Sequence, residues 1–174
     1  MRALLLLVLT AILSGCTPGG RDVPGAGQIA IVWRGSAAGT FRAAASATLC
    51  AETGQVELIA VQGDSGVAFV FFPTDSAALP AVEYPILVSD TIEADRPSAM
   101  AALKWFDGTD LPSFEGLRGT VRITSSGEEA SGSVEATFRL HQGEDTLRVT
   151  GRFLAVPVER APTGCGAVHR RNLG

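Results

Sequence analysis

The sequence has little of the side-chain chemistry from which most catalytic and metal sites are built. Its 174 residues include only two histidines, His141 and His169, three cysteines and one lysine, Lys104. Transition metals are bound mainly through His and Cys, and His is also the most common group for proton transfer near neutral pH. We therefore expect no metal site and no cofactor, and we expect that the protein is not an enzyme.

An excess of positive charge is also missing. The chain has 14 basic and 18 acidic residues, which gives a formal net charge of −4 at pH 7. Proteins that bind nucleic acid need a basic surface to neutralise phosphates, so we expect no nucleic-acid partner. Apart from Lys104, every basic residue is an arginine. Together with the many alanines and glycines, this indicates a GC-rich genome and argues against assigning chemistry to any single arginine.

The N-terminal apolar run is too short to cross a membrane. Ala3–Leu13 is apolar except for Thr10, whereas a transmembrane helix needs about twenty such residues. A run of this length behind one basic residue, Arg2, is typical of a secretory signal peptide.

The stretch Leu13-Ser14-Gly15-Cys16, which closes this run, resembles the lipobox of bacterial lipoproteins. In that family the cysteine receives a diacylglycerol and becomes the N-terminus after cleavage. The resemblance implies a signal peptide over residues 1–15, an acylated Cys16 carrying chains such as palmitate, and a cell-envelope location. Thr17 follows the cysteine instead of Asp, which favours the outer over the inner membrane. The alternative is an ordinary cleaved signal peptide with an incidental cysteine.

The rest of the chain divides into a tether and one domain. Residues 16–27 combine the lipidated cysteine with a Gly- and Pro-rich stretch that has no apolar periodicity, as in a flexible linker. Residues 28–174 are long enough to bury a core as a single domain. In an exported protein, the remaining cysteines, Cys50 and Cys165, favour a disulfide, with two free thiols or a metal site as the alternatives.

Apolar and polar residues alternate with a period of two in the last third of the domain. The pattern covers Leu117–Thr124, Ser133–His141 and Thr146–Ala155, which are separated by polar turns. It predicts an antiparallel meander with one buried and one solvated face.

Further strands are predicted upstream at Ile29–Trp33, Gln55–Gln62, Val67–Phe72 and Tyr84–Val88. Two segments are ambiguous: Phe41–Cys50 is rich in Ala, and Pro97 could open a helix over Ala99–Phe106. We interpret both as strands. The fold class is then all-β, an antiparallel β-sandwich of about 8–9 short strands, with a closed β-barrel as the alternative.

Gly63-Asp64-Ser65-Gly66 resembles the nucleophile sequence of trypsin-like serine proteases, and its Gly-Asp-Ser is similar to that of GDSL-type esterases. Trypsin-like enzymes need a histidine upstream of the serine, and both histidines here lie downstream. In the esterases an Asp stands three residues before the histidine, where this chain has Gly166. We interpret Ser65 as part of a turn.

The solvated face of the meander carries a candidate anion site. If its turns are tight, three transverse rows form: Arg122-Glu135-Arg152, Thr120-Thr137-Thr150 and Arg118-Arg139-Arg148. The last row lacks a carboxylate and lies beside His141. Its guanidiniums could hold a carboxylate or phosphate through paired N–H donors. The alternative is a solvated sheet whose arginines pair with acidic residues of turns or of the 90–115 region.

The sequence therefore predicts a lipid-anchored, non-enzymatic binding or structural module of the cell envelope. Its expected partners are the membrane, through the lipid, and an envelope protein or an anionic glycolipid. The alternative function is a carrier that holds a small apolar or amphipathic ligand between its sheets. An internal cavity lined by Phe69, Phe71 and Trp105 would favour the carrier, and a filled core would favour the module.

Overall fold

The computed structural model describes residues 23–74, 78–88, 91, 95–106 and 108–162. The expected signal peptide, the lipidation site Cys16, and the C-terminal Cys165 and His169 lie outside these ranges. In the described part of the chain, no helix has the length and apolar character needed to cross a membrane.

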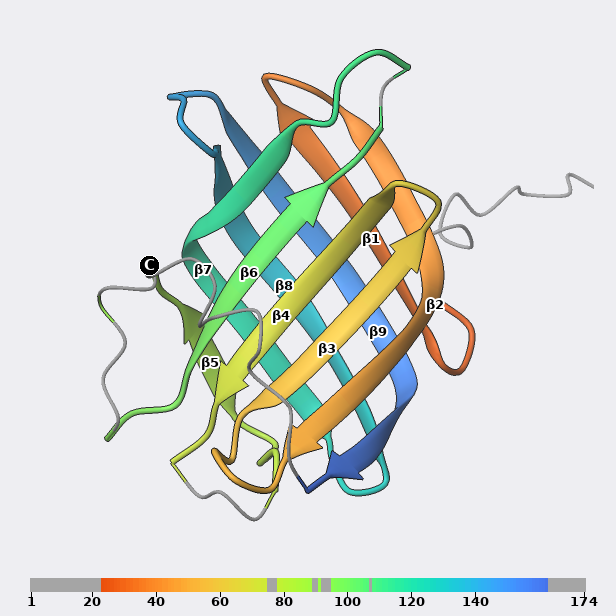
Figure 1. The fold of residues 1–174 in the computed structure, drawn as a ribbon, viewed down its shortest axis with the longest axis vertical. Helices are drawn as coiled ribbons and strands as arrows, with labels where there is room; N and C mark the ends of the chain where they lie inside the picture. The colour runs from red at the N-terminus through yellow and green to blue at the C-terminus, as the bar shows by residue number, and fades with distance from the viewer. Residues whose placement is uncertain (1–22, 75–77, 89–90, 92–94, 107, 163–174) are drawn as a thin grey trace, which may run out of the picture.

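Within these ranges, nine β-strands form a single sheet that closes on itself as a barrel (Figure 1). The strands are β1 (Gln28–Gly35), β2 (Gly39–Cys50), β3 (Val56–Gln62), β4 (Ser65–Phe72), β5 (Glu83–Ile86), β6 (Ser98–Lys104), β7 (Ser113–Ser125), β8 (Glu129–Leu140) and β9 (Thr146–Ala161). Their order around the barrel is β1-β2-β3-β4-β6-β5-β7-β8-β9. The all-β prediction is confirmed, in the form of the closed barrel given as the alternative to the sandwich. Both ambiguous segments are strands, as β2 and β6.

The last strand closes the barrel by pairing with β1, and it then pairs with β2 as well. Its first half runs antiparallel to β1, and residues beyond Ala155 run parallel to β2. Ala155 has a φ of 47° at the point where the partner changes, and its N–H donates a hydrogen bond to Ser131 Oγ at 2.9 Å. This local twist lets β9 cover the sheet edge that a sandwich would leave open.

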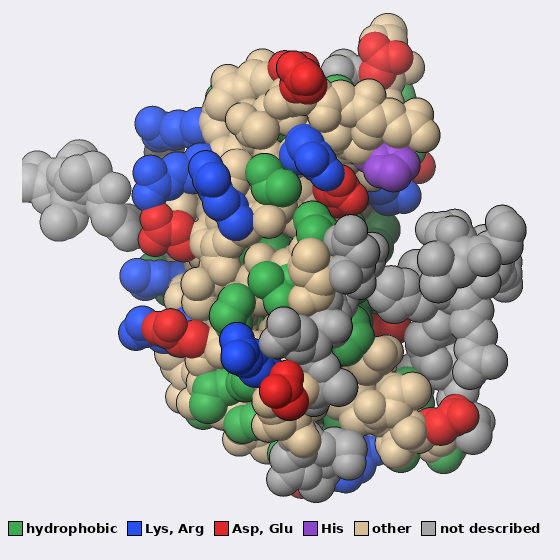
Figure 2. Space-filling view, turned by 90° about the vertical axis from the view of Figure 1, so that its left-hand side faces the viewer, with side chains coloured by type: hydrophobic (Ala, Val, Ile, Leu, Met, Phe, Trp, Pro, Cys, Tyr) green, Lys and Arg blue, Asp and Glu red, His purple; other side chains and the backbone are tan. Residues whose placement is uncertain are grey.

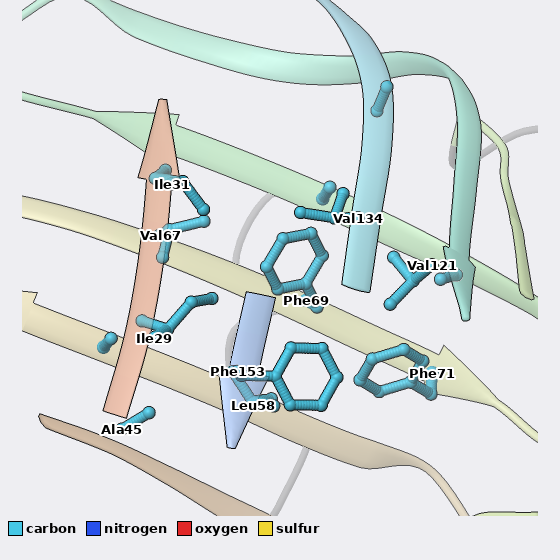
Figure 3. Close-up of a cluster of buried hydrophobic side chains, with 14 of the residues drawn as sticks. Ile29, Ile31, Ala45, Leu58, Val67, Phe69, Phe71, Val121, Val134 and Phe153 are labelled. Carbon is cyan, nitrogen blue, oxygen red and sulfur yellow. The ribbon is translucent and has the colours of Figure 1, made fainter. Parts of the chain in front are cut away.

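Aliphatic and aromatic side chains fill the interior of the barrel (Figure 3). Phe69 and Phe71 are fully buried, with ring centroids 6.4 Å apart, and Phe71 packs edge-on against Tyr84 at 5.1 Å. Trp105 packs between Trp33 and Phe114, with ring centroids at 5.0 and 5.1 Å. Of the three aromatic residues expected to line a carrier cavity, Phe69 and Phe71 thus belong to the buried core and Trp105 is partly buried against it. Each fully buried Phe contributes roughly 1.5–3 kcal/mol of apolar transfer energy.

Candidate functional site

The meander of β7, β8 and β9 has the predicted faces but a different register. The rows expected from the sequence, with Arg122 opposite Glu135 and Arg139 opposite Arg148, pair Ile123 with Val134 and Leu140 with Leu147. The structure pairs Ile123 with Gly132, and Leu147 with Phe138. Each β8 partner is thus displaced by two residues. Because the side-chain period of a strand is two, this shift keeps every side chain on its predicted face and changes only its neighbours.

Arg139 does not lie between Arg118 and Arg148, which corrects the expected row of three arginines. It lies opposite Glu115 of β7 and Thr146 of β9. A β-bulge between Gly116 and Arg118 sets the register that places Glu115 there. The Arg139 guanidinium donates a hydrogen bond to Glu115 Oε1 at 2.7 Å. Its charge is therefore compensated, by a residue of the acidic region that the alternative interpretation named.

Nine outward-facing residues of these strands instead form a three-by-three pattern, which we call the arginine array. Its rows are Arg118-Thr137-Arg148, Thr120-Glu135-Thr150 and Arg122-Ser133-Arg152. An arginine stands at each corner, a hydroxyl residue in the middle of each side, and a carboxylate at the centre. Standard strand spacing and rise place the corner Cα atoms about 10 Å apart across the strands and about 13 Å apart along them.

The arginine array surrounds an open hollow of about 950 Å³ in the outer wall of the barrel. The short Thr and Ser side chains form its floor and the longer arginines form its rim. Glu83 of β5 and Ala30 and Val32 of β1 extend the lining on either side. The hollow thus exists because short Thr and Ser side chains lie between longer arginine side chains.

Backbone packing under the hollow is tight. Gly119 faces the interior with a φ of +138°, and a Cβ at this position would lie 2.4 Å from Ala136 Cα. Only glycine fits there, because an added side chain would meet backbone atoms of β8 and not a flexible side chain.

Two corners of the array are neutralised and two are not. Arg148 forms an ion pair with Glu135, and Arg122 forms one with Glu83. Within the described ranges, the exposed Arg118 and Arg152 have no carboxylate partner. They stand at opposite corners. Four arginines and two glutamates line the hollow, which gives it a formal charge of +2 in a chain whose net charge is −4.

Basic side chains gather along the left side of the view in Figure 2, with acidic side chains between them. A smaller hollow of about 190 Å³ lies over β3, β4 and β6 and is lined mainly by apolar residues, including the exposed Ile59 and Val61. The outer wall of the barrel is thus polar and arginine-rich over β7–β9 and apolar over β3, β4 and β6.

No family model, curated protein or solved structure matches this chain.

Arg34 is a candidate residue that the sequence did not indicate. It lies on β1 directly opposite Arg148 of β9 and extends the first row of the array. Arg34 and Arg148 become neighbours only because the barrel closes between β1 and β9, which are far apart in the chain. No local sequence pattern therefore indicates that they are close in space. Directly opposed cations repel, so Arg34 adds to the positive potential beside the hollow.

Ser65 and His141, which were also singled out from the sequence, take part in turn and backbone contacts of the fold. Ser65 Oγ accepts a hydrogen bond from the Phe106 N–H at 3.0 Å, and Ser65 pairs with Gln62 across a tight turn that includes Gly63, with a φ of +58°. His141 is exposed directly after β8, and its backbone N–H donates to the Ser113 carbonyl. The residues that the structure describes contain no group of three or more His, Cys, Asp or Glu side chains arranged to hold a metal.

Cys50 is buried at the end of β2, with 1% of its surface exposed. Its expected partner Cys165 lies outside the described residues, so the disulfide stays a prediction.

Proposed function

We propose that this protein is a lipid-anchored, non-enzymatic module of the bacterial cell envelope that binds an anionic partner through the hollow of the arginine array. The observation that carries the proposal is the pair of exposed guanidiniums, Arg118 and Arg152, which have no carboxylate partner among the described residues. They belong to a hollow with a formal charge of +2.

The physical reason is that an anion relieves the repulsion between neighbouring cations. A guanidinium can donate two parallel N–H bonds to a carboxylate or phosphate, and these charge-assisted bonds are about twice as strong as neutral ones. The array is exposed, so water and salt screen each contact. Affinity therefore requires several arginines to act together, and it should fall as ionic strength rises.

The anchor supports an envelope role. The lipobox-like sequence ends at Cys16, and the residues up to 27 have the composition of a flexible linker. A linker of this length has an end-to-end distance of about 20 Å. The domain would stay close to the membrane surface, preferentially that of the outer membrane, where anionic glycolipids and envelope proteins are available as partners.

Core packing supports a binding module over a carrier. A carrier needs an internal cavity, and Phe69 and Phe71, two of its expected lining residues, are fully buried in mutual contact. The third, Trp105, packs against Trp33. The hollow in the outer wall, in contrast, is open to solvent, and most of its lining residues are charged or carry a hydroxyl.

Lipidation is tested in cells that express the full-length chain. Globomycin, which blocks cleavage of lipoprotein signal peptides, should cause a larger precursor to accumulate, and Cys16→Ala should abolish acyl labelling. An unchanged electrophoretic pattern in both experiments would contradict the anchor. Mass spectrometry under non-reducing conditions of the same material should show Cys50 linked to Cys165.

Anion binding is tested with the detergent-solubilised full-length protein and a short polyphosphate, by calorimetry at low and moderate salt. Arg118→Gln should weaken binding by about tenfold, the loss expected for one charge-assisted contact. Arg139→Gln is the matched control, because Arg139 is on the same wall and already paired with Glu115. Equal losses for the two variants would refute a site in the hollow.

A further inference from the structure

We infer that the hollow accommodates an acidic oligosaccharide, a ligand with negatively charged groups towards its two ends and a neutral, hydroxyl-bearing part between them. This inference rests on the proposed anion-binding function and names the chemical class of the ligand. It follows from the order in which charges and hydroxyls occur across the arginine array.

The two arginines without a carboxylate partner stand on either side of Glu135, so a single small anion shared between them would lie against that carboxylate. Arg118 is on β7 and Arg152 on β9, two strands and two rows apart on the diagonal of the array. With strands about 4.8 Å apart and a rise of about 3.3 Å per residue, their Cα atoms are separated by roughly 16 Å. A ligand that satisfies both guanidiniums therefore carries two anionic groups at separate positions.

The centre of the hollow repels negative charge. Glu135 stands in the middle of the array, where its Oε1 is engaged by Arg148 and its other oxygen is left as an acceptor. A carboxylate only accepts hydrogen bonds, so the group above it must be a donor. A chain with a charge on every unit would place an anion against Glu135, and such like-charge contacts are unfavourable.

Hydroxyl groups surround this carboxylate. Thr120, Ser133, Thr137 and Thr150 line the floor of the hollow, and each can both donate and accept a hydrogen bond. Sugar hydroxyls have the same dual character and fit a floor that mixes hydroxyls with one carboxylate. The lining includes no aromatic side chain, so hydrogen bonds, and not stacking on sugar faces, supply the contacts.

The size of the hollow suits several sugar units. Its volume of about 950 Å³ is near the upper end of the roughly 300–1,000 Å³ typical of small-molecule sites. Few apolar side chains line it, because Val134 and Ala136 point into the core of the barrel and only Ala30 and Val32 of β1 face outward, so an acyl chain would gain little from entering. The saccharide portion of a ligand is therefore the part that this surface recognises.

The experiment compares three probes on the full-length protein in detergent. A hyaluronan tetrasaccharide has two carboxylates separated by a neutral sugar, a neutral maltohexaose has none, and a short polyphosphate has charge on every unit. We expect the hyaluronan fragment to bind at least about tenfold more tightly than either of the others. Arg118→Gln and Arg152→Gln should each weaken its binding to a similar extent.

Threonine variants test the hydroxyl floor. Thr120→Val and Thr150→Val keep a β-branched residue suited to a strand and remove a hydroxyl, so each should weaken hyaluronan binding several-fold and leave polyphosphate binding unchanged. Thr146→Val is the matched control, since Thr146 is exposed on β9 outside the hollow.

The possible outcomes distinguish failure of the saccharide inference from failure of the anion-binding function. If polyphosphate binds as tightly as hyaluronan and the Thr120 and Thr150 variants bind both probes normally, the saccharide inference fails and the anion site stands. If maltohexaose binds as tightly as hyaluronan, the requirement for acidic groups is refuted. If no probe binds, or the arginine variants bind like the unmodified protein, the proposed anion-binding function fails as well.

Discussion

Arg139 lies opposite Glu115 across β7 and β8, and the two side chains form an ion pair with a 2.7 Å hydrogen bond. This relationship removes Arg139 from the candidate site, because its charge already has a partner. Both side chains are 42% exposed, so water screens the pair. We expect a double-mutant cycle with Arg139→Gln and Glu115→Gln to give a coupling energy below about 1 kcal/mol that shrinks in high salt. A coupling of several kcal/mol would show that the pair is more buried than the structure indicates.

Gly119 should be essential to the stability of the β7–β8 pairing beneath the hollow. We expect Gly119→Ala to lower the free energy of unfolding by more than about 2 kcal/mol, since it adds both backbone strain and a clash. Gly127→Ala is the control, because Gly127 has a similar φ of +141° but nothing within 4 Å of an added Cβ. Chemical denaturation measures both. If the two variants lose equal stability, the close approach between β7 and β8 is not present.

Ala155 is strained where β9 changes its partner strand. A non-glycine residue in the left-handed region costs about 1–2 kcal/mol, and Ala155 has a φ of 47°. Ala155→Gly should therefore raise the unfolding free energy by about 0.5–1 kcal/mol, after the greater chain entropy of glycine is subtracted. Ala44→Gly, in the regular part of β2, should lower it by a similar amount. Destabilisation by Ala155→Gly would contradict the strained crossover.

Tyr84 should make stability depend on pH in the alkaline range. Burial raises the pKa of Tyr84 well above its usual value near 10, so the folded state keeps the proton that the unfolded state releases. The stability that Tyr84 contributes is complete below the unfolded pKa. It should fall by about 1.4 kcal/mol per pH unit as the pH rises above about 10.

Tyr84 is the only tyrosine of the chain, so tyrosinate absorbance reports this group alone. We expect the absorbance to rise only together with loss of the folded state, and we expect Tyr84→Phe to flatten this part of the stability curve. Tyrosinate formation near pH 10 in a protein that is still folded would show that the hydroxyl is accessible.

The strands and their faces could be predicted from the sequence because a period of two is a local signal. Val121, Val134 and Val149 face the interior as expected. The register could not be predicted, because a slip of two residues leaves every face unchanged. Turn geometry and the bulge in β7 decide it, and they place Thr137 instead of Arg139 between Arg118 and Arg148.

Barrel closure was also beyond the reach of local patterns. It depends on β1 pairing with β9 and on β5 lying beside β7, which joins segments distant in the chain. Closure brings Arg34 next to Arg148 and brings Glu83 to Arg122. The sequence therefore indicated which surface carries the arginines, whereas closure and register decide which of them are neutralised.

The most direct test of the array observes its guanidiniums during binding. In full-length protein labelled with ¹⁵N at arginine, the Nε–Hε signals can be assigned by single substitutions and followed as the hyaluronan fragment is added. We expect the signals of Arg118 and Arg152 to shift together with one dissociation constant, while that of Arg139 stays in place. Shifts confined to arginines outside the array, or an Arg139 signal that moves as far as the other two, would contradict the account.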